Sequence, residues 1–151
     1  MIEVFKLDPE AKTPTRNNPN DAGIDLYALE DVTIFTGCTA KVKTGIAIHI
    51  PIGYVGKIED RSGLAAKGLR TGGGVVDSGY SGDVTIVIHN FSAVSDLCNK
   101  TDTKMDTAYL IRKHDKIAQL LIYKVETQPV IEVKQLWTSD RSDNGIGSSG
   151  K

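Results

Sequence analysis

The stretch Val84-Thr85-Ile86-Val87-Ile88-His89 decides the fold class, because an aliphatic side chain stands at every second position. Successive side chains of a β-strand point to opposite faces, so Val84, Ile86 and Ile88 would share one apolar face. The stretch therefore predicts a strand that packs one side against a core.

Strand-like runs recur along the rest of the chain. They occupy residues 2–7, 40–50, 117–123 and 131–133. These runs are rich in β-branched residues, and turn signals such as Pro51-Ile52-Gly53 and Ser81-Gly82-Asp83 separate them. Many short strands at this spacing predict an all-β sandwich or barrel.

Only the segment Ser62 to Gly68 favours a helix, with Ser62 as its N-cap and Gly68 as its end. We expect at most two turns. Residues 8–20, 92–104 and 138–151 are polar or rich in proline or glycine and predict loops. Because the 151 residues show no repeat and no linker, they fit one domain.

The composition argues against several classes of partner. The chain has 18 Lys and Arg against 19 Asp and Glu, so direct nucleic-acid binding is not expected. No 18 apolar residues run together, and residues 1–9 lack the apolar region of a secretory signal. We therefore expect no membrane span and a protein that is not secreted but cytoplasmic, in the host cytoplasm if the source is viral. Cys38 and Cys98 are too few for a disulfide framework; they could form one bridge, but the expected absence of secretion favours buried free thiols.

Two acidic segments are candidates for chemistry. Asp77 lies in the glycine-rich segment 72–80 after two β-branched residues, where glycines admit a flat ligand and a carboxylate can act as general base. The alternative is a turn-forming Asp in a hairpin. On a strand, Asp21 and Asp25 would share one face and could hold a hydrated Mg²⁺; alternatively they cap a loop.

Three polar segments are candidates for binding an anion. Arg61-Ser62-Gly63 suits an anion, or else forms a capped helix with a solvated arginine. Gln119 interrupts the apolar run 117–123 and is either a satisfied core amide or a ligand contact. Residues 145–150 match G-x-G-x-x-G, but no helix can follow them. With Arg141 before it, this tail is a flexible segment or a phosphate-binding flap.

Five of these segments, taken in order, carry a resemblance that none carries alone. They are Asp21–Leu26, Arg61–Gly68, Gly74–Asp83, Asp115–Leu120 and Arg141–Gly150. Through them, and over nearly its whole length, the chain resembles the trimeric deoxyuridine triphosphatases (dUTPases).

The resemblance implies a jelly-roll-like β-barrel over residues 1–137 that assembles as a homotrimer. Residues 138–151 would form a flexible arm that closes the active site of a neighbouring subunit. The implied reaction is Mg²⁺-assisted attack of water on the α-phosphate, which converts dUTP to dUMP and pyrophosphate. This activity limits uracil incorporation into DNA and supplies dUMP for thymidylate synthesis.

The resemblance also assigns roles to single residues. Asp77 would be the base, Tyr80 would pack on the deoxyribose, and Asp25 would hold water ligands of Mg²⁺. The remaining substrate contacts would be Gly74 and Val75 at the uracil, Ile146 and Gly147 over the base, Arg61, Ser62, Gly63 and Gln119 at the phosphates, and Arg141, Ser148 and Ser149 at the γ-phosphate.

Some positions depart from the family pattern. Ile146 stands where many members have an aromatic residue, which predicts weaker capping of the uracil. Gly79 replaces an acidic residue of many cellular members, and His114 replaces a glycine at a turn before Asp115. The stretch 92–112 is longer than usual and is either a protein-binding excursion or a tolerated surface loop.

Two alternatives remain to be weighed against this interpretation. A dCTP deaminase of the same superfamily would need a different catalytic set from the one around Val75, Val76 and Asp77. A dUTPase-like regulatory protein could act through residues 92–112, with or without activity.

Overall fold

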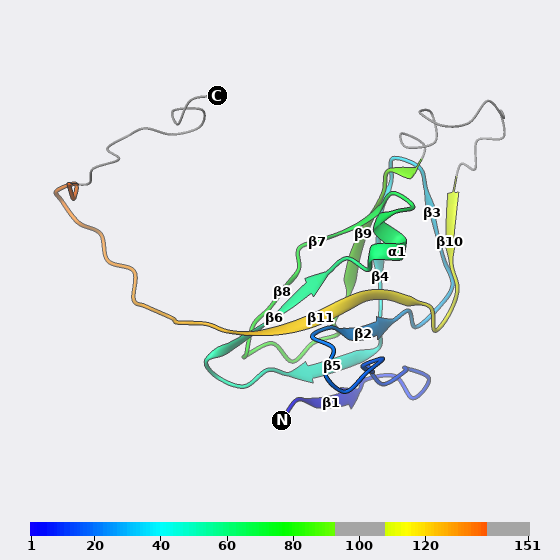
Figure 1. Ribbon diagram of the computed structural model, residues 1–151, viewed down its shortest axis with the longest axis horizontal. Coiled ribbons are helices and arrows are strands. Elements are labelled where there is room, and N and C mark those ends of the chain that lie inside the picture. The colour runs from blue at the N-terminus through cyan, green and yellow to red at the C-terminus, as the bar shows by residue number, and fades with distance from the viewer. Residues whose placement is uncertain (93–107, 139–151) are drawn as a thin grey trace.

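The computed structural model describes residues 1–92 and 108–138, and the remaining residues are left aside (Figure 1). The described part is all β apart from one short helix, as the sequence predicted. The elements are β1 (Glu3–Lys6), β2 (Ile24–Tyr27), β3 (Val32–Phe35), β4 (Thr39–Val42), β5 (Ile46–His49), β6 (Tyr54–Glu59), α1 (Ser62–Ala65), β7 (Leu69–Gly72), β8 (Val75–Val76), β9 (Ile86–Asn90), β10 (Ala108–Ile111) and β11 (Lys116–Lys124).

The strands pair antiparallel in four small sheets. Their orders are β2-β11-β6-β8, β4-β9-β7, β1-β5 and β3-β10. β11 is central to the four-stranded sheet, and Gln119 on it stands opposite Asp25 of β2 on one side and Glu59 of β6 on the other. This register brings together three segments that are far apart in the sequence.

The alternating stretch behaves as its pattern predicts. Val84, Ile86 and Ile88 are almost fully buried and belong to one cluster of apolar side chains that unites the sheets. Burying an aliphatic side chain of this kind contributes about 1.5–3 kcal/mol, so the alternation accounts for the position of β9. The longer run 40–50 is split into β4 and β5, because Gly45 between them adopts a left-handed backbone with φ of 70°.

The helix begins one residue earlier than expected. Arg61 is the N-cap residue and makes no side-chain capping hydrogen bond, so the prediction of Ser62 as the cap is wrong. Gly68 follows the helix with φ of 82°, and a Cβ there would lie 2.7 Å from the Cα of Ser92. Glycine is therefore required where this segment turns into β7.

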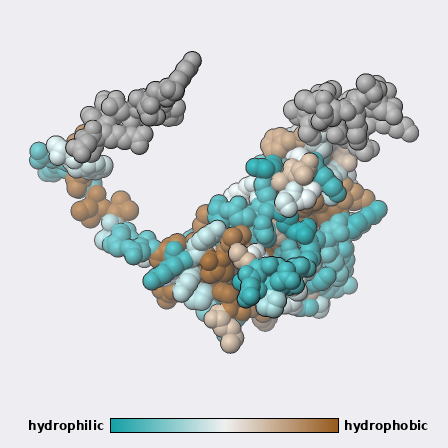
Figure 2. Space-filling view, in the orientation of Figure 1, coloured by the Kyte–Doolittle hydropathy of each residue, from teal (hydrophilic) through white to brown (hydrophobic). Residues whose placement is uncertain are grey.

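Two further predictions are wrong. Residues 125–138 contain no strand, and Ile131 and Val133, predicted in a last strand, are exposed by 76% and 53%. None of the strands in residues 1–92 and 108–138 lies beside this segment, which leaves the body after β11 (Figure 1). Figure 2 shows its apolar side chains standing away from the rest of the surface. Cys38 is a free thiol as predicted, but it is exposed rather than buried.

Several predictions concern residues outside the described part. They include Cys98, most of the stretch 92–112, and nearly all of the predicted arm 138–151. Within the described residues, no helix is long and apolar enough to cross a membrane.

Candidate active site

Three of the five segments meet in one hollow of about 720 Å³. β2 contributes Asp25 with the preceding Asp21, and the junction between β6 and α1 contributes Arg61-Ser62-Gly63. β11 contributes Lys116 and Gln119. The site is thus assembled by the strand order β2-β11-β6, which places β11 between the other two strands.

Asp25 is the charged centre of this hollow. Its side chain is only 14% exposed, and its carboxylate contacts Arg61 Nε at 3.1 Å and Lys116 Nζ at 2.6 Å. Arg61 and Lys116 are therefore two cations held in fixed positions, and with Asp21 also in the lining the formal charges of the hollow balance. Both cations can donate charge-assisted hydrogen bonds to an anionic ligand with several phosphate oxygens.

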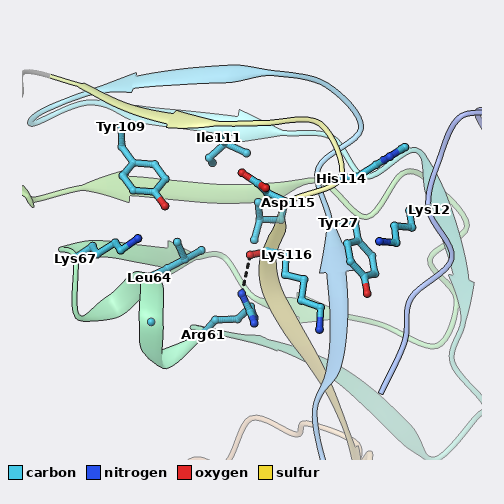
Figure 3. A pocket seen from close by; sticks show the side chains of 12 residues that line it. Lys12, Tyr27, Arg61, Leu64, Lys67, Tyr109, Ile111, His114, Asp115 and Lys116 are labelled. Carbon is cyan, nitrogen blue, oxygen red and sulfur yellow. Dashed lines mark hydrogen bonds between the residues drawn. The ribbon is translucent and has the colours of Figure 1, made fainter. Parts of the chain in front are cut away.

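Arg61 is held from a second side as well. Its guanidinium donates through Nη1 to the main-chain carbonyl of Lys116 at 3.0 Å (Figure 3). It also lines a second hollow of about 490 Å³, flanked by Lys67 and Tyr109 on one side and Lys12 on the other. Because two acceptors fix its guanidinium, Arg61 is an ordered part of the site rather than a solvated cation.

Asp21 does not pair with Asp25 in the way a shared strand would impose. It precedes β2, and its carboxylate accepts the N–H of Asn18 at 2.9 Å and also the Asn18 side-chain amide. Asp21 lines the same hollow, but it serves there as a loop cap, the alternative that the sequence had left open.

Gln119 is both satisfied and turned toward the hollow. Its Nε2 donates to the main-chain carbonyl of Asp60 at 2.8 Å. Its carboxamide oxygen lies where a Cβ on Gly23 would collide with it, so a larger residue at that position would displace the Gln119 amide. Ser62 and Gly63, the first residues of α1, are exposed on the rim of the same hollow.

Asp77 lies in a different hollow, of about 210 Å³, which Val75 and Tyr80 also line. It follows β8 directly, and its carbonyl accepts the N–H of Tyr80 at 3.0 Å, which closes a turn. The Tyr80 hydroxyl donates to the carbonyl of Asp83 at 2.8 Å. Asp77 therefore forms a turn, as one interpretation of the sequence expected. Its carboxylate is also exposed at the end of a strand, as a general base requires.

Gly74 holds β8 close against β6. The N–H of Ile58 donates to the Gly74 carbonyl at 2.7 Å, and a Cβ on Gly74 would lie 2.6 Å from the Ile58 oxygen. Only glycine permits this approach without a shift of the main chain.

The two hollows share no lining residue, so in the described part of the chain Asp77 and Asp25 line separate hollows. Five predicted site residues lie outside that part: Arg141, Ile146, Gly147, Ser148 and Ser149. Their roles stay predictions.

The sequence analysis gave no role to two residues that the structure places at the site. Lys116 lies inside the segment 115–120. Its positive charge, two positions after the turn residue His114, was the only feature of the sequence that could have pointed to its contact with Asp25. Asp60 directly precedes Arg61, but nothing in its spacing indicated that it contacts another strand.

The turn before β11 is fastened by Asp31. Its carboxylate accepts the N–H of Lys113 at 2.7 Å and a guanidinium N–H of Arg112 at 3.0 Å. The hydrogen bond from the Lys113 main chain, and then that from Arg112, lower the pKa of Asp31. His114 in the same turn has a left-handed backbone, with φ of 67°. This agrees with the expectation that His114 replaces a glycine at a turn.

Comparison with known proteins identifies the family of the chain. The dUTPase family model matches residues 9–150. The deoxyuridine 5'-triphosphate nucleotidohydrolase of Nocardia farcinica is 41% identical over 152 residues, which cover 99% of this chain and 85% of that protein. The dUTPase of Staphylococcus bacteriophage 80alpha, solved with dUPNHPP, is 32% identical with a TM-score of 0.85 and covers 100% of this chain and 99% of its own.

A second solved relative is a dUTPase variant from phage phi11 of S. aureus, described with a structural Mg(II) ion. It is 32% identical with a TM-score of 0.76, over 89% of this chain and 97% of its own. The likeness to these solved dUTPases confirms the jelly-roll-like β fold that the resemblance implied. Since the family model spans nearly the whole sequence, the chain belongs to the dUTPase family and is a hydrolase.

Proposed function

We propose that this protein hydrolyses dUTP to dUMP and pyrophosphate by attack of water on the α-phosphorus. The observation that carries the proposal is the hollow in which Arg61 and Lys116 flank Asp25, with Ser62, Gly63 and Gln119 on its walls. Two fixed cations, with a hydroxyl, a main-chain N–H and an amide beside them, suit a triphosphate. The names of the relatives support deoxyuridine triphosphate as the particular substrate.

In the proposed mechanism, the carboxylate of Asp77 accepts a proton from the attacking water, and the pyrophosphate leaves from the α-phosphorus. A positioned base of this type contributes about 10²–10⁴-fold. Gly74 and Val75 bind the uracil, and Tyr80 packs on the deoxyribose. The Arg61 guanidinium, the Ser62 hydroxyl, the Gly63 N–H and the Gln119 amide hold the phosphates, because phosphoryl transfer depends on positioning and charge neutralisation.

The described residues fit a magnesium ion that the substrate itself ligates. In residues 1–92 and 108–138, no group of three or more His, Cys, Asp or Glu is placed to hold a metal. Asp25 already contacts two cations, but a carboxylate has about four acceptor sites and can also accept hydrogen bonds from metal-bound water. Mg²⁺ bound in this way supplies charge that offsets the triphosphate. The phi11 relative described with Mg(II) supports the choice of ion.

The proposed active unit is a homotrimer, with each site shared between subunits. The separation of the Asp77 hollow from the Asp25 hollow supports this, because a second chain could bring the proposed base of one chain to the proposed phosphate contacts of another. Val130, Leu136 and Trp137 are exposed by 99%, 80% and 74%, which is costly for a monomer and suits contact with a neighbour. The arm 138–151, with Arg141, Ser148 and Ser149, would then close a third subunit's site over the γ-phosphate, and Ile146 and Gly147 would cover the base.

Its role in the cell would be to remove dUTP and supply dUMP, in the cytoplasm. Binding of a partner protein through residues 92–112 stays a prediction.

The experiment that tests the proposal is pyrophosphate release with Mg²⁺ from dUTP, dCTP, dTTP and UTP, for wild type and Asp77→Asn. We expect release from dUTP alone, and its loss in the variant. No release from dUTP by a folded wild-type trimer would overturn the proposed function. Release that survives in Asp77→Asn would overturn the assignment of the base.

A further inference from the structure

Asp60 connects the two main sheets at the point where the phosphate-binding segment begins. Its Oδ1 accepts the main-chain N–H of Thr71 at 2.6 Å and the Thr71 hydroxyl at 2.8 Å. Its Oδ2 contacts Arg70 Nε at 3.0 Å. Thr71 and Arg70 belong to β7 in the sheet β4-β9-β7, whereas Asp60 follows β6 of the sheet that carries the site.

The main chain of Asp60 is engaged toward the site at the same time. Its carbonyl accepts the Nε2 proton of Gln119 at 2.8 Å, and its peptide leads directly into Arg61. The residue is thus fixed by its side chain on β7 and by its main chain on β11. A shift at Asp60 would move the Gln119 amide and the start of Arg61-Ser62-Gly63 together.

The charge of Asp60 argues against a direct role in holding phosphate. A carboxylate next to an anion-binding cluster opposes the substrate, and its Arg70 partner is 59% exposed, so that pair is weak. The two Thr71 hydrogen bonds are short, and the Asp60 side chain is only 24% exposed. The contacts of Asp60 therefore fix the position of this segment of the main chain.

We propose that Asp60 is a positioning residue: it fixes the Arg61-Ser62-Gly63 segment and the Gln119 amide in the geometry that holds the triphosphate. This inference rests on the proposed function. Three roles make different predictions. If Asp60 is a positioning residue, its loss lowers kcat/KM. If it only repels the substrate, its loss lowers KM, and if it is purely structural, its loss changes the thermal midpoint alone.

The test measures kcat and KM for dUTP, and the thermal midpoint, in wild type, Asp60→Ala, Asp60→Asn and Arg70→Ala. A displacement of about 1 Å costs up to 10²-fold, so we expect kcat/KM to fall at least tenfold in Asp60→Ala. Asp60→Asn keeps an oxygen for the Thr71 N–H and should recover most of this loss. Arg70→Ala is the matched control: it removes the exposed ion pair, leaves the Thr71 contacts and should stay within about twofold of wild type.

A double-mutant cycle with Gln119→Ala separates positioning from stability. If Asp60 acts through Gln119, the fold-loss caused by Asp60→Ala shrinks when Gln119 is already alanine. Should Asp60→Ala not fold, the same cycle is run with Thr71→Val, which removes one of the two donors.

Three results would overturn the inference: a lower KM in Asp60→Ala and Asp60→Asn, a change in the thermal midpoint alone, or an equal fold-loss in both Gln119 backgrounds. Lack of dUTP hydrolysis by the wild type would instead reject the proposed function.

Discussion

His114 has a left-handed backbone, with φ of 67°, in the turn that leads into β11. Its N–H donates to Ala28 and its Nε2 contacts the Glu10 carbonyl, so the turn is held from two sides. A β-branched residue tolerates this conformation poorly, whereas asparagine adopts it readily.

We therefore expect His114→Val to lower the free energy of unfolding by about 1–3 kcal/mol, and His114→Asn to lower it by less than about 1 kcal/mol. Urea unfolding at one fixed protein concentration measures both, because assembly makes stability concentration-dependent. Equal losses in the two variants would show that backbone strain is not what distinguishes this position.

Asp25 holds two cations in the hollow that we propose binds the triphosphate. Asp25→Asn removes the charge that holds Arg61 and Lys116, so both side chains should lose their fixed positions. We expect kcat/KM for dUTP to fall about ten- to a hundredfold, with a higher Mg²⁺ concentration needed for the half-maximal rate. Steady-state kinetics over a Mg²⁺ titration measures both quantities. Wild-type kinetics at every Mg²⁺ concentration would contradict the role given to Asp25.

At the scale of elements, the approach of β8 to β6 depends on Gly74. Gly74→Ala places a Cβ 2.6 Å from the Ile58 oxygen, so the strand pair must open. Opening costs about 1–3 kcal/mol and should raise KM for dUTP, because Val75 and Asp77 follow on the same segment. Gly79→Ala is the matched control, since nothing lies within 4 Å of a Cβ there. The test compares the thermal midpoint and the KM for dUTP of Gly74→Ala with those of Gly79→Ala. Equal values in the two variants would contradict the prediction.

Asp31 stabilises the turn between β10 and β11, and this contribution depends on pH. Its pKa is lowered in the folded state, first by the Lys113 N–H and then by Arg112, so its contribution exists above the pKa of the unfolded chain. The contribution fades as the pH falls below about 4, through the lowered folded pKa. The thermal midpoints of wild type and Asp31→Asn should therefore differ by a constant amount from pH 6 to 8 and converge below pH 4. A difference that persists at pH 2 would contradict this account.

At the scale of the whole molecule, shared sites predict complementation between two inactive variants. Asp77→Asn lacks the base and Arg61→Ala lacks a phosphate contact, but a mixed trimer can join the intact halves. Random assembly of equal amounts should restore about a quarter of the sites. The measurement is dUTP hydrolysis after the two variants are unfolded and refolded together, with each refolded alone as the control. No gain on mixing would mean that each site lies within one chain.

Much of this arrangement was predictable from the sequence. The alternation of 84–89 and the apolar run 117–123 predicted β9 and β11, since burial on one face depends on local spacing. β7 carries two adjacent polar residues, Arg70 and Thr71, so no period-two pattern announced it. The prediction of a strand at 131–133 was wrong for another reason. Alternating apolar residues indicate a face that needs a partner, but they do not show that the same chain provides one.

The sequence alone determined the all-β class, the five ordered segments and, through them, the family. Only the tertiary structure decided which of these segments meet. The central place of β11 brought Asp25, Arg61 and Gln119 into one hollow and left Asp77 in another. It also paired Asp25 with Lys116 through the register of β2 against β11, and Asp60 with Thr71 across the segment that contains α1. Local sequence sets the period of an element, but the neighbours of that element follow from how all the apolar faces are buried together.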